Sequence, residues 1–235
     1  MTGLQTYDSK LVTIHNDRNS EAFKYLSPSW LVLNNIYTEM NNTNTYAEDA
    51  WGRSPTIPYL QIEAWYENEH SMTGQGLRAQ SYWSILGGAL AGHMFGNYPI
   101  YDYSSGWEDA LNDVGSVGMT HLSAFFNSID WWTLVPDWAH SLVTAGYGVL
   151  GAADYAGSAI NAAGTLAVIY MPSNRTMTVD MSLFAGTVTC RWFDPTDGSY
   201  AADVASPHVN SGTHGFSHAG TNSLGDADWI LLLEA

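Results

Sequence analysis

Positively charged residues are scarce in this chain of 235 residues. It has 7 Lys and Arg residues against 23 Asp and Glu residues, and its formal net charge is −16. Proteins that bind nucleic acids or anionic membranes hold the phosphate groups with clustered Lys and Arg side chains. We therefore expect no nucleic acid partner and no membrane partner.

Cysteine and long apolar runs are also nearly absent. Cys190 is the only cysteine, which excludes an intrachain disulfide and a zinc site made of cysteines. No run approaches the ~18 apolar residues of a membrane-spanning helix. The eight histidines show no ligand spacing of the HExxH type, and no P-loop, GxGxxG or GxSxG motif occurs. We expect neither a metal nor a cofactor.

Aromatic residues are abundant where charged residues are few. Each class makes up 13% of the chain, and the aromatic residues include 10 Trp and 14 Tyr. A surface rich in rings, amides and hydroxyls suits sugar recognition, because rings stack on the apolar faces of pyranoses and polar groups pair with their hydroxyls. A Trp-rich hydrophobic core explains the same composition equally well.

The pattern of the sequence changes near residue 145. Before it, short apolar runs alternate with amphipathic segments, which is typical of alternating strands and helices. We expect strands over 11–15, 30–37, 59–67 and 93–101, and helices over 20–26, 76–92 and within 107–140. After residue 150, five to seven short strands separated by turn residues predict a small antiparallel β-sandwich, with Cys190 in its core.

Polar side chains follow several of the expected strands. Glu63 comes directly after an apolar strand core, and ligand chemistry in parallel α/β folds gathers at the carboxyl ends of strands. Trp65 and Tyr66 beside it would form a wall on which a sugar stacks. His15 and His93 also fall at strand ends, where each would bind a substrate hydroxyl or be an ordinary polar residue. The alternative for Glu63 is a structural ion pair.

A glycosidase needs a second carboxylate, ~5–5.5 Å from the first in retaining enzymes and ~6.5–9.5 Å from it in inverting ones. Glu67 lies four residues after Glu63, roughly 13 Å along an extended strand, which is too far unless the chain turns sharply. Asp17 and Glu39 each follow another apolar run. Asp17 and Glu39 are therefore the candidates within this chain for the second catalytic carboxylate.

Four N-terminal segments carry a family resemblance: LVTIH, WLVLNNIY, PYLQIEAWYEN and RAQSYWSILGGALAGHMFGNYPIY. They resemble the second half of the apiosidase-like glycoside hydrolases. The C-terminal segments GTLAVIYMPSNRTMTVDM, RWFDPTDGSY and TNSLGDADWILLLE are similar to the sandwich of these proteins, which is described as collagen-binding. The resemblance covers nearly the whole chain. It implies a TIM-barrel enzyme of the retaining group, whose catalytic carboxylates follow strands four and seven.

The resemblance also implies roles for individual residues. Glu63, at the end of what would be strand seven, matches the position of the family's nucleophile. Glu67 would be a nearby site residue or the alternative assignment. The residues that would line the sugar cleft are His15, Asn35, Trp65, Tyr66, His93 and Phe95.

The sequence departs from the family pattern in its first half. The family's first four strands, with the Gly-Gly-Asp-like segment that supplies the acid/base, have no counterpart, and Gly87-Gly88 is followed by Ala89. We therefore expect the fold class α/β plus all-β, with a partial (half) TIM-type barrel at 1–145 and a β-sandwich at 146–235. Because Met1 begins close to an expected strand, we expect a shortened gene.

A half-barrel leaves open strand edges, because four βα units cannot close an eight-stranded barrel. The sandwich or a missing half would cover these edges, or two half-barrels would pair in a homo-oligomer. We expect the homo-oligomer. The resemblance implies an extracellular or periplasmic location, although no signal peptide is visible at the N-terminus.

These observations predict a glycoside hydrolase that cleaves plant or microbial polysaccharide, of the cellulose, hemicellulose or pectin side-chain type. Glu63 would be the nucleophile or general base, and Asp17, Glu39 or a group of a partner chain would be the acid. The alternative is a non-catalytic carbohydrate-binding protein that keeps the aromatic cleft but lacks the acid. An adhesion module is a third interpretation, if the sandwich binds protein.

Overall fold

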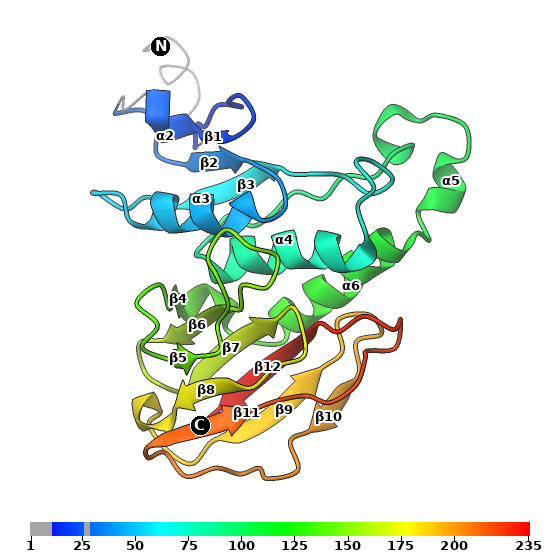
Figure 1. The fold of residues 1–235 in the computed structure, drawn as a ribbon. Coiled ribbons are helices and arrows are strands. Elements are labelled where there is room, and N and C mark those ends of the chain that lie inside the picture. Colours follow the sequence, from blue (N-terminus) through cyan, green and yellow to red (C-terminus); the bar gives the residue numbers. More distant parts are fainter. Residues whose placement is uncertain (1–10, 26–28) are drawn as a thin grey trace.

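The computed structural model describes residues 11–25 and 29–235, and Figure 1 shows their arrangement. The fold is mixed α/β, with mostly antiparallel sheets. In chain order its elements are β1 (Ser20–Glu21), α2 (Ala22–Tyr25), β2 (Asn34–Tyr37), α3 (Asn42–Trp51), β3 (Tyr59–Glu63), α4 (Gly74–Leu86), η1 (Ile100–Asp102), α5 (Trp107–Ala110), α6 (Val114–Asn127), η2 (Trp131–Thr133), β4 (Leu134–Pro136), β5 (Val143–Ala145), β6 (Gly157–Asn161), β7 (Leu166–Met171), β8 (Met177–Asp180), η3 (Met181–Leu183), β9 (Thr189–Phe193), β10 (Tyr200–Ala202), β11 (Thr213–Phe216) and β12 (Trp229–Glu234).

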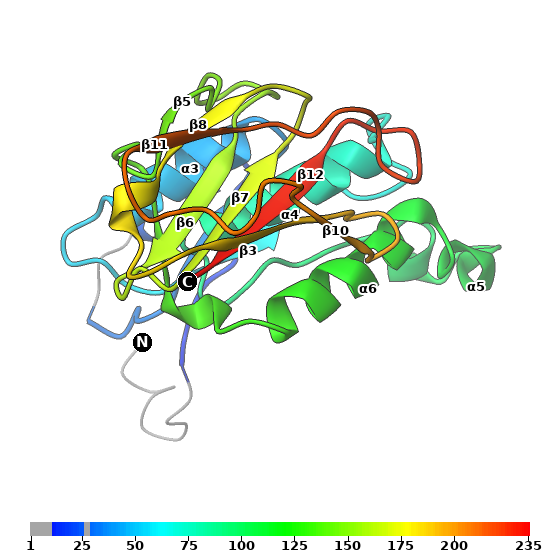
Figure 2. The same cartoon turned by 90° about the horizontal axis from the view of Figure 1, so that it is seen from below.

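These elements stack in layers. The sheet β1-β2-β3 lies at one end of the molecule, and helices α4 and α6 lie between it and the six-stranded sheet β10-β9-β12-β7-β6-β4 (Figure 1). The sheet β11-β8-β5 covers the other face of the six-stranded sheet. Figure 2, from below, shows α6 running beside the strands of this sandwich.

The central strands β7 and β12 are apolar along their length because both faces of their sheet are buried. Side chains of a strand alternate between the two faces. Ala167 and Ile169 face the small sheet and belong to the core of the sandwich, whereas Val168 and Tyr170 belong to a second core with α4 and α6. Cys190 lies in the sandwich core, and burial raises the pKa of its thiol to about 12.

The N-terminal sheet contains a parallel pair. Strands β2 and β3 run parallel, and α3 connects them as the crossover. Helix α4 then starts after Thr73, whose hydroxyl accepts a hydrogen bond from the Gly76 N–H at 3.1 Å and caps the helix. The segment 92–98 follows α4 and returns beside β3 through two isolated parallel bridges.

Two expected strands are not formed. Residues 11–17 have no ladder partner within the described chain, because β1 pairs antiparallel with β2 and takes its outer edge. The expectation of a strand at 11–15 is therefore wrong. The expectation of a continuous strand at 93–101 is wrong too. The segment's two bridges to the chain at Gln61 and Glu67 are out of register with each other, so no continuous ladder forms between them.

The half-barrel is not confirmed. A half-barrel would contain a series of four parallel strands. Residues 11–25 and 29–133 instead contain one parallel strand pair, β2 and β3, and two isolated parallel bridges. Strands β4 and β5, which precede residue 146, already pair with β6 and β8 of the sandwich. A domain boundary between 145 and 146 stays a prediction.

A buried ion pair joins α4 to the C-terminal strands. The Arg78 guanidinium donates hydrogen bonds to both carboxylate oxygens of Asp228 at 2.9 and 2.8 Å, and to Asp226 at 2.7 Å. Arg78 and Asp228 are 1% and 0% exposed. Burial opposes the charge of Arg78, but its hydrogen bonds and charge interaction with Asp228 outweigh burial and raise its pKa. The Tyr170 hydroxyl and Asn222 amide also donate to Asp228.

Replacing Asp228 with Asn is expected to lower the free energy of unfolding by about 3–5 kcal/mol, because it leaves a buried guanidinium without its main counter-charge. Urea unfolding followed by fluorescence measures this change. Glu234→Gln is the matched control, since Glu234 forms an exposed pair with Arg191. It is expected to cost no more than about 1 kcal/mol. If both variants lost the same free energy of unfolding, the buried Arg78–Asp228 pair would contribute no more to stability than the exposed Arg191–Glu234 pair.

Candidate active site

The candidate active site lies at the carboxyl ends of β2 and β3, where the sheet is irregular. A register shift places Tyr37 of β2 opposite Glu63 of β3. On the other side, Glu67 lies six positions after Gln61, whereas their bridged partners, Asn97 and His93, are only four positions apart. The chain after β3 therefore bulges outward, and such a bulge re-aims the side chains that it carries.

Three side chains converge on the Glu63 carboxylate. The Nε2 atom of His15 lies 2.9 Å from Glu63 Oε2, and Tyr37 and Tyr66 lie close enough to this carboxylate for its charge to act on both phenols. Burial, followed by the charge of Glu63, raises the pKa of Tyr66 to about 12 and also raises the pKa of Tyr37. Both phenols are therefore protonated at neutral pH and are available as hydrogen-bond donors beside Glu63.

Trp65 supplies an aromatic surface beside Glu63. Its ring stacks on His70 with a centroid distance of 5.0 Å and an interplanar angle of 24°, and its carbonyl accepts a hydrogen bond from Gln80 of α4 at 2.6 Å. The loop after it is strained: Asn68, His70 and Ser71 have φ values of +66°, +50° and +57°. Non-glycine residues in this conformation gather at functional sites.

Buried polar atoms without a partner occur on the segments that carry His15, Tyr37 and Glu63. Among the side-chain atoms that lack a hydrogen bond within the described chain are Asn16 Oδ1, Asn35 Oδ1, Glu39 Oε2, Gln61 Oε1 and Trp65 Nε1. Folded proteins leave few buried polar atoms unpaired. Both donors and acceptors are present, so the arrangement suits a ligand with several hydroxyl groups.

Asn35 and Asp17 have different surroundings. The Asn35 side chain is buried, and its Nδ2 donates to Thr13 Oγ1 at 3.1 Å, which fixes the segment that carries His15 against β2. Asp17 is exposed, and its carbonyl accepts a hydrogen bond from Asn16. The structure thus buries Asn35 in β2 and leaves Asp17 exposed to solvent.

Glu39 is a carboxylate whose charge, like that of Glu63, acts on Tyr37. Burial contributes most to the raised pKa of Tyr37, and the charges of Glu63 and Glu39 both add to it, so Tyr37 lies within electrostatic reach of both carboxylates. The Glu39 Oε1 atom accepts a weak hydrogen bond from Asn19 at 3.4 Å and lies 3.9 Å from Arg18 Nε.

Glu67 caps helix α6 rather than contacting this cluster. Its Oε1 accepts from the Gly115 N–H at 2.6 Å, and its Oε2 accepts from the Ser116 N–H at 2.9 Å and from Asn97 Nδ2 at 2.8 Å. A carboxylate that receives the free N–H groups of a helix N-terminus is stabilised there. A Cβ at Gly115 would come within 2.8 Å of the Glu67 carboxyl, so this approach requires glycine.

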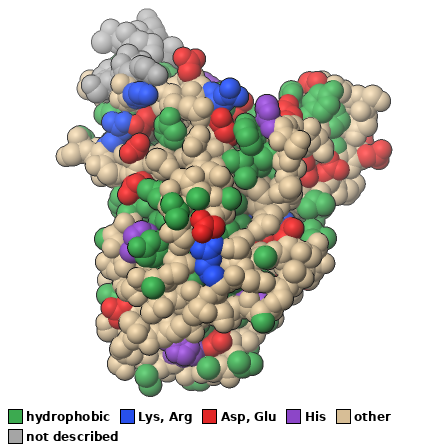
Figure 3. All heavy atoms as spheres, viewed as in Figure 1, with side chains coloured by type: hydrophobic (Ala, Val, Ile, Leu, Met, Phe, Trp, Pro, Cys, Tyr) green, Lys and Arg blue, Asp and Glu red, His purple; other side chains and the backbone are tan. Residues whose placement is uncertain are grey.

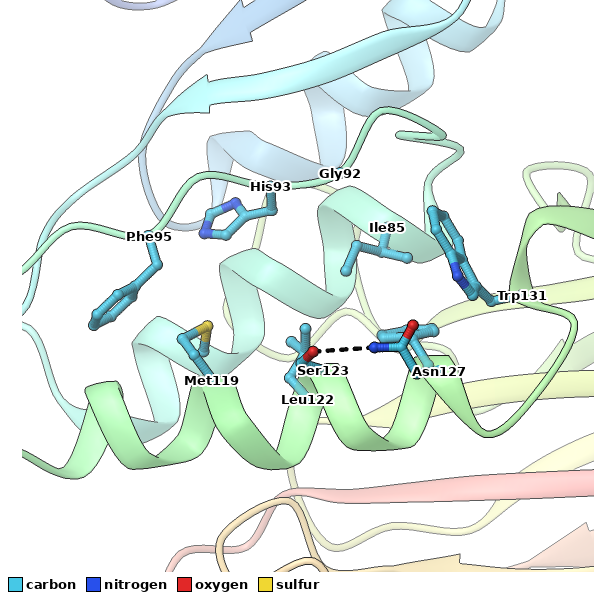
Figure 4. Close-up of a pocket in the computed structure, with 10 residues that line it drawn as sticks. Ile85, Gly92, His93, Phe95, Met119, Leu122, Ser123, Asn127 and Trp131 are labelled. Carbon is cyan, nitrogen blue, oxygen red and sulfur yellow. Dashed lines mark hydrogen bonds between the residues drawn. The ribbon is translucent and has the colours of Figure 1, made fainter. Parts of the chain in front are cut away.

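His93 and Phe95 line a different cavity, of about 310 Å³, between segment 92–95, α4 and α6. Figure 4 shows both side chains directed toward α6, where the Asn127 amide donates to Ser123. Both ring nitrogens of His93 are buried without a partner in the described chain, and burial lowers the pKa of His93 to about 4. Glu63 is not among the lining residues, so a role of His93 and Phe95 in sugar binding stays a prediction.

Sequence reasoning missed Tyr37. Its signal was its place at the end of the apolar run WLVLNNIY, beside the strand that ends in Glu63. Parallel neighbours end at the same edge of a sheet, but the register that sets Tyr37 opposite Glu63 depends on a bulge that the residue pattern does not reveal.

Two further searches of the described residues concern metals and membranes. No group of three or more His, Cys, Asp or Glu side chains in residues 11–25 and 29–235 is placed to hold a metal ion. No helix in the same residues has the length and apolar character needed to cross a membrane.

Two solved structures share this fold. One, titled "Glycoside hydrolase", has a TM-score of 0.79 and 21% identity, and the match covers 92% of this chain and 56% of that one. The other is a glycoside hydrolase family 5 protein from Bacteroides vulgatus, with a TM-score of 0.84, 20% identity, and coverage of 99% and 57%. This chain therefore spans just over half the length of these proteins. No curated protein sequence matches it.

Family models match both parts of the sequence. The model described as "Putative collagen-binding domain of a collagenase" matches residues 150–234. The model described as "Apiosidase-like, catalytic domain" matches residues 1–133, which is more than half of the chain. The resemblance carried by the strand-end motifs is confirmed, and the chain belongs to the apiosidase-like family of glycoside hydrolases.

Proposed function

We propose that this chain hydrolyses glycosidic bonds in plant or microbial polysaccharide, with Glu63 as the catalytic carboxylate. The observation that supports this most directly is the convergence of His15, Tyr37 and Tyr66 on Glu63 at a sheet edge. Donors held around a carboxylate orient it toward a substrate. Family membership supports the same reaction class, and an extracellular or periplasmic location is part of the proposal.

The proposed reaction has two steps. In the first, Glu63 attacks the anomeric carbon and forms a glycosyl ester, while an acid gives its proton to the departing glycosidic oxygen. In the second step, the acid that lost its proton now acts as a base and takes a proton from water. The water oxygen attacks the anomeric carbon, which breaks the glycosyl ester and releases Glu63. Retention follows from the family and not from a measured separation of carboxylates.

Glu39 is our preferred acid within this chain. Its carboxyl shares Tyr37 as a neighbour with Glu63, and its Oε2 is buried without a partner among the described residues. Asp17, which is exposed, and a group from another chain are the remaining candidates. A second function is a carbohydrate-binding protein without catalysis, in which the Trp65 ring and the unpaired polar atoms near Glu63 bind the sugar.

Glu63→Gln is expected to reduce kcat on polysaccharide by about 1,000-fold or more, because the amide is a poor nucleophile. The release of reducing ends over a panel of polysaccharides measures it, with circular dichroism to confirm that the variant is folded. Unchanged turnover would contradict the role of Glu63. Binding of a glycan without release of reducing ends by the parent protein would favour the non-catalytic function.

Glu67→Gln separates the two assignments of the nucleophile. Because Glu67 caps α6, its replacement is expected to lower the free energy of unfolding by about 1–2 kcal/mol. If Glu67→Gln instead abolished turnover at full stability while Glu63→Gln stayed active, the nucleophile would be Glu67.

We also propose that the chain self-associates through segment 92–98. Within the described residues, the backbone N–H and C=O groups of His93 and Phe95 have no partner, while Gly92 and Met94 bond to β3. An unpaired edge is a template for another strand. Light scattering is expected to show a dimer that Phe95→Lys converts to a monomer, whereas Met94→Lys, on an exposed side chain, leaves it dimeric. A parent protein that is monomeric at all concentrations would contradict the pairing.

A further inference from the structure

A group of aromatic side chains continues outward from Glu63. After segment 92–98 the chain leaves the sheet and forms a projecting loop that ends in α5 (Figure 1). We use the name aromatic loop for residues 98–107. Its rings are Tyr98, Tyr101, Tyr103 and Trp107. Tyr103 is 75% exposed, and Tyr98 and Tyr101 are also exposed.

The rings form two groups, and the first begins beside the candidate nucleophile. Tyr66, whose pKa is raised by the charge of Glu63, lies 5.6 Å from Tyr101 between ring centroids, and Tyr101 lies 5.9 Å from Tyr98. Farther along the chain, Tyr103 and Trp107 meet edge to face at 5.5 Å. A ligand that extends from Glu63 along this loop would meet one aromatic surface after another.

The loop is held in place although its rings are exposed. The Tyr101 hydroxyl donates to Glu69 at 2.8 Å, and the Asn68 amide donates to the carbonyl of Tyr98 at 2.8 Å. Tyr103 has a φ of +56°, in the left-handed region that a bulky residue rarely adopts. Such strain is costly and is concentrated at functional sites, and no burial of Tyr103 compensates for it. Ordered, exposed rings of this kind mark a binding surface.

The charges around the aromatic loop define the kind of ligand. Glu69, Asp102, Glu108 and Asp109 lie on or beside it, and the sequence has no Lys or Arg between Arg78 and Arg175. Figure 3 shows acidic and hydrophobic side chains together on this projecting part of the molecule. Carboxylates accept hydrogen bonds from sugar hydroxyls but repel a carboxylate on the ligand.

We propose that the aromatic loop is an extended subsite for the successive rings of a neutral oligosaccharide, and that it discriminates against uronic acid polymers. This rests on the proposed function, because Glu63 marks where the ligand starts. Tyr66 and Tyr101 contact the sugars nearest Glu63, and Tyr103 and Trp107 contact those farther away. The loop thereby selects a neutral polysaccharide over a short or acidic one.

The test measures binding in the Glu63→Gln background, so that hydrolysis does not consume the ligand. Isothermal titration calorimetry uses disaccharides and hexasaccharides of β-1,4-glucan, β-1,4-xylan and β-1,4-galactan, and the hexasaccharide of α-1,4-galacturonate. We expect at least one neutral hexasaccharide to bind at least about tenfold more tightly than its disaccharide and than the galacturonate, a difference equal to about 1.4 kcal/mol.

Tyr103→Ala with Trp107→Ala is expected to remove this gain with length and to leave the affinity for the disaccharide within about twofold. Trp132→Ala is the matched control, because Trp132 is 60% exposed but lies on η2, away from the aromatic loop. Tyr103→Phe with Trp107→Phe keeps rings at both positions and is expected to retain most of the gain, which excludes local unfolding as the cause.

Two results would overturn the subsite. One is a hexasaccharide affinity that the double alanine variant does not change, and the other is the lack of any gain with length for all neutral sugars. Tighter binding of galacturonate would overturn the selection against acidic polymers. These outcomes are independent of catalysis. If binding strengthens with ligand length but the parent protein releases no reducing ends, the proposed hydrolase activity is contradicted and the proposed subsite is supported.

Discussion

The arrangement of the layers depends on the buried pair of Arg78 and Asp228. A charge in a protein interior is tolerated only when a counter-charge and hydrogen bonds satisfy it, and here one carboxylate binds the guanidinium through two oxygens. Helix α4 is thereby fixed over the six-stranded sheet. Gln80 of the same helix donates a hydrogen bond to the carbonyl of Trp65. Helix α4 therefore connects the sandwich to the candidate site and helps to fix the position of that site.

Sequence patterns predicted the sandwich better than the N-terminal part. Apolar runs such as LAVIYM and the turn residues around them report burial directly, and burial on both faces gives continuous apolar strands. In the N-terminal part the same kind of run was ambiguous. LVTIH is apolar yet has no strand partner among residues 11–25 and 29–235, because the two residues of β1 occupy the edge that it would have needed. Competition for an edge depends on three-dimensional contacts that no local pattern contains.

The candidate site shows the same limit at the level of single residues. Glu63 could be recognised from its place at a strand end. Glu67, with the same side chain four residues later, has a different environment because its partners, Gly115 and Ser116, lie far along the chain. The role of His93 in sugar binding stays a prediction, and its place in a cavity with residues of α4 and α6 could not be foreseen from a strand-end pattern.

The second core of the six-stranded sheet lies between the sandwich and the helices. Tyr82 of α4 stacks on Tyr170 of β7 at 5.0 Å and 9°, and the Trp83 indole donates to the carbonyl of Tyr155 at 2.7 Å. The sandwich thus presents an aromatic face to the helices instead of a polar one. Removing the sandwich would expose this aromatic face and the facing side of α4 to water, so the helices and the sandwich depend on each other for burial.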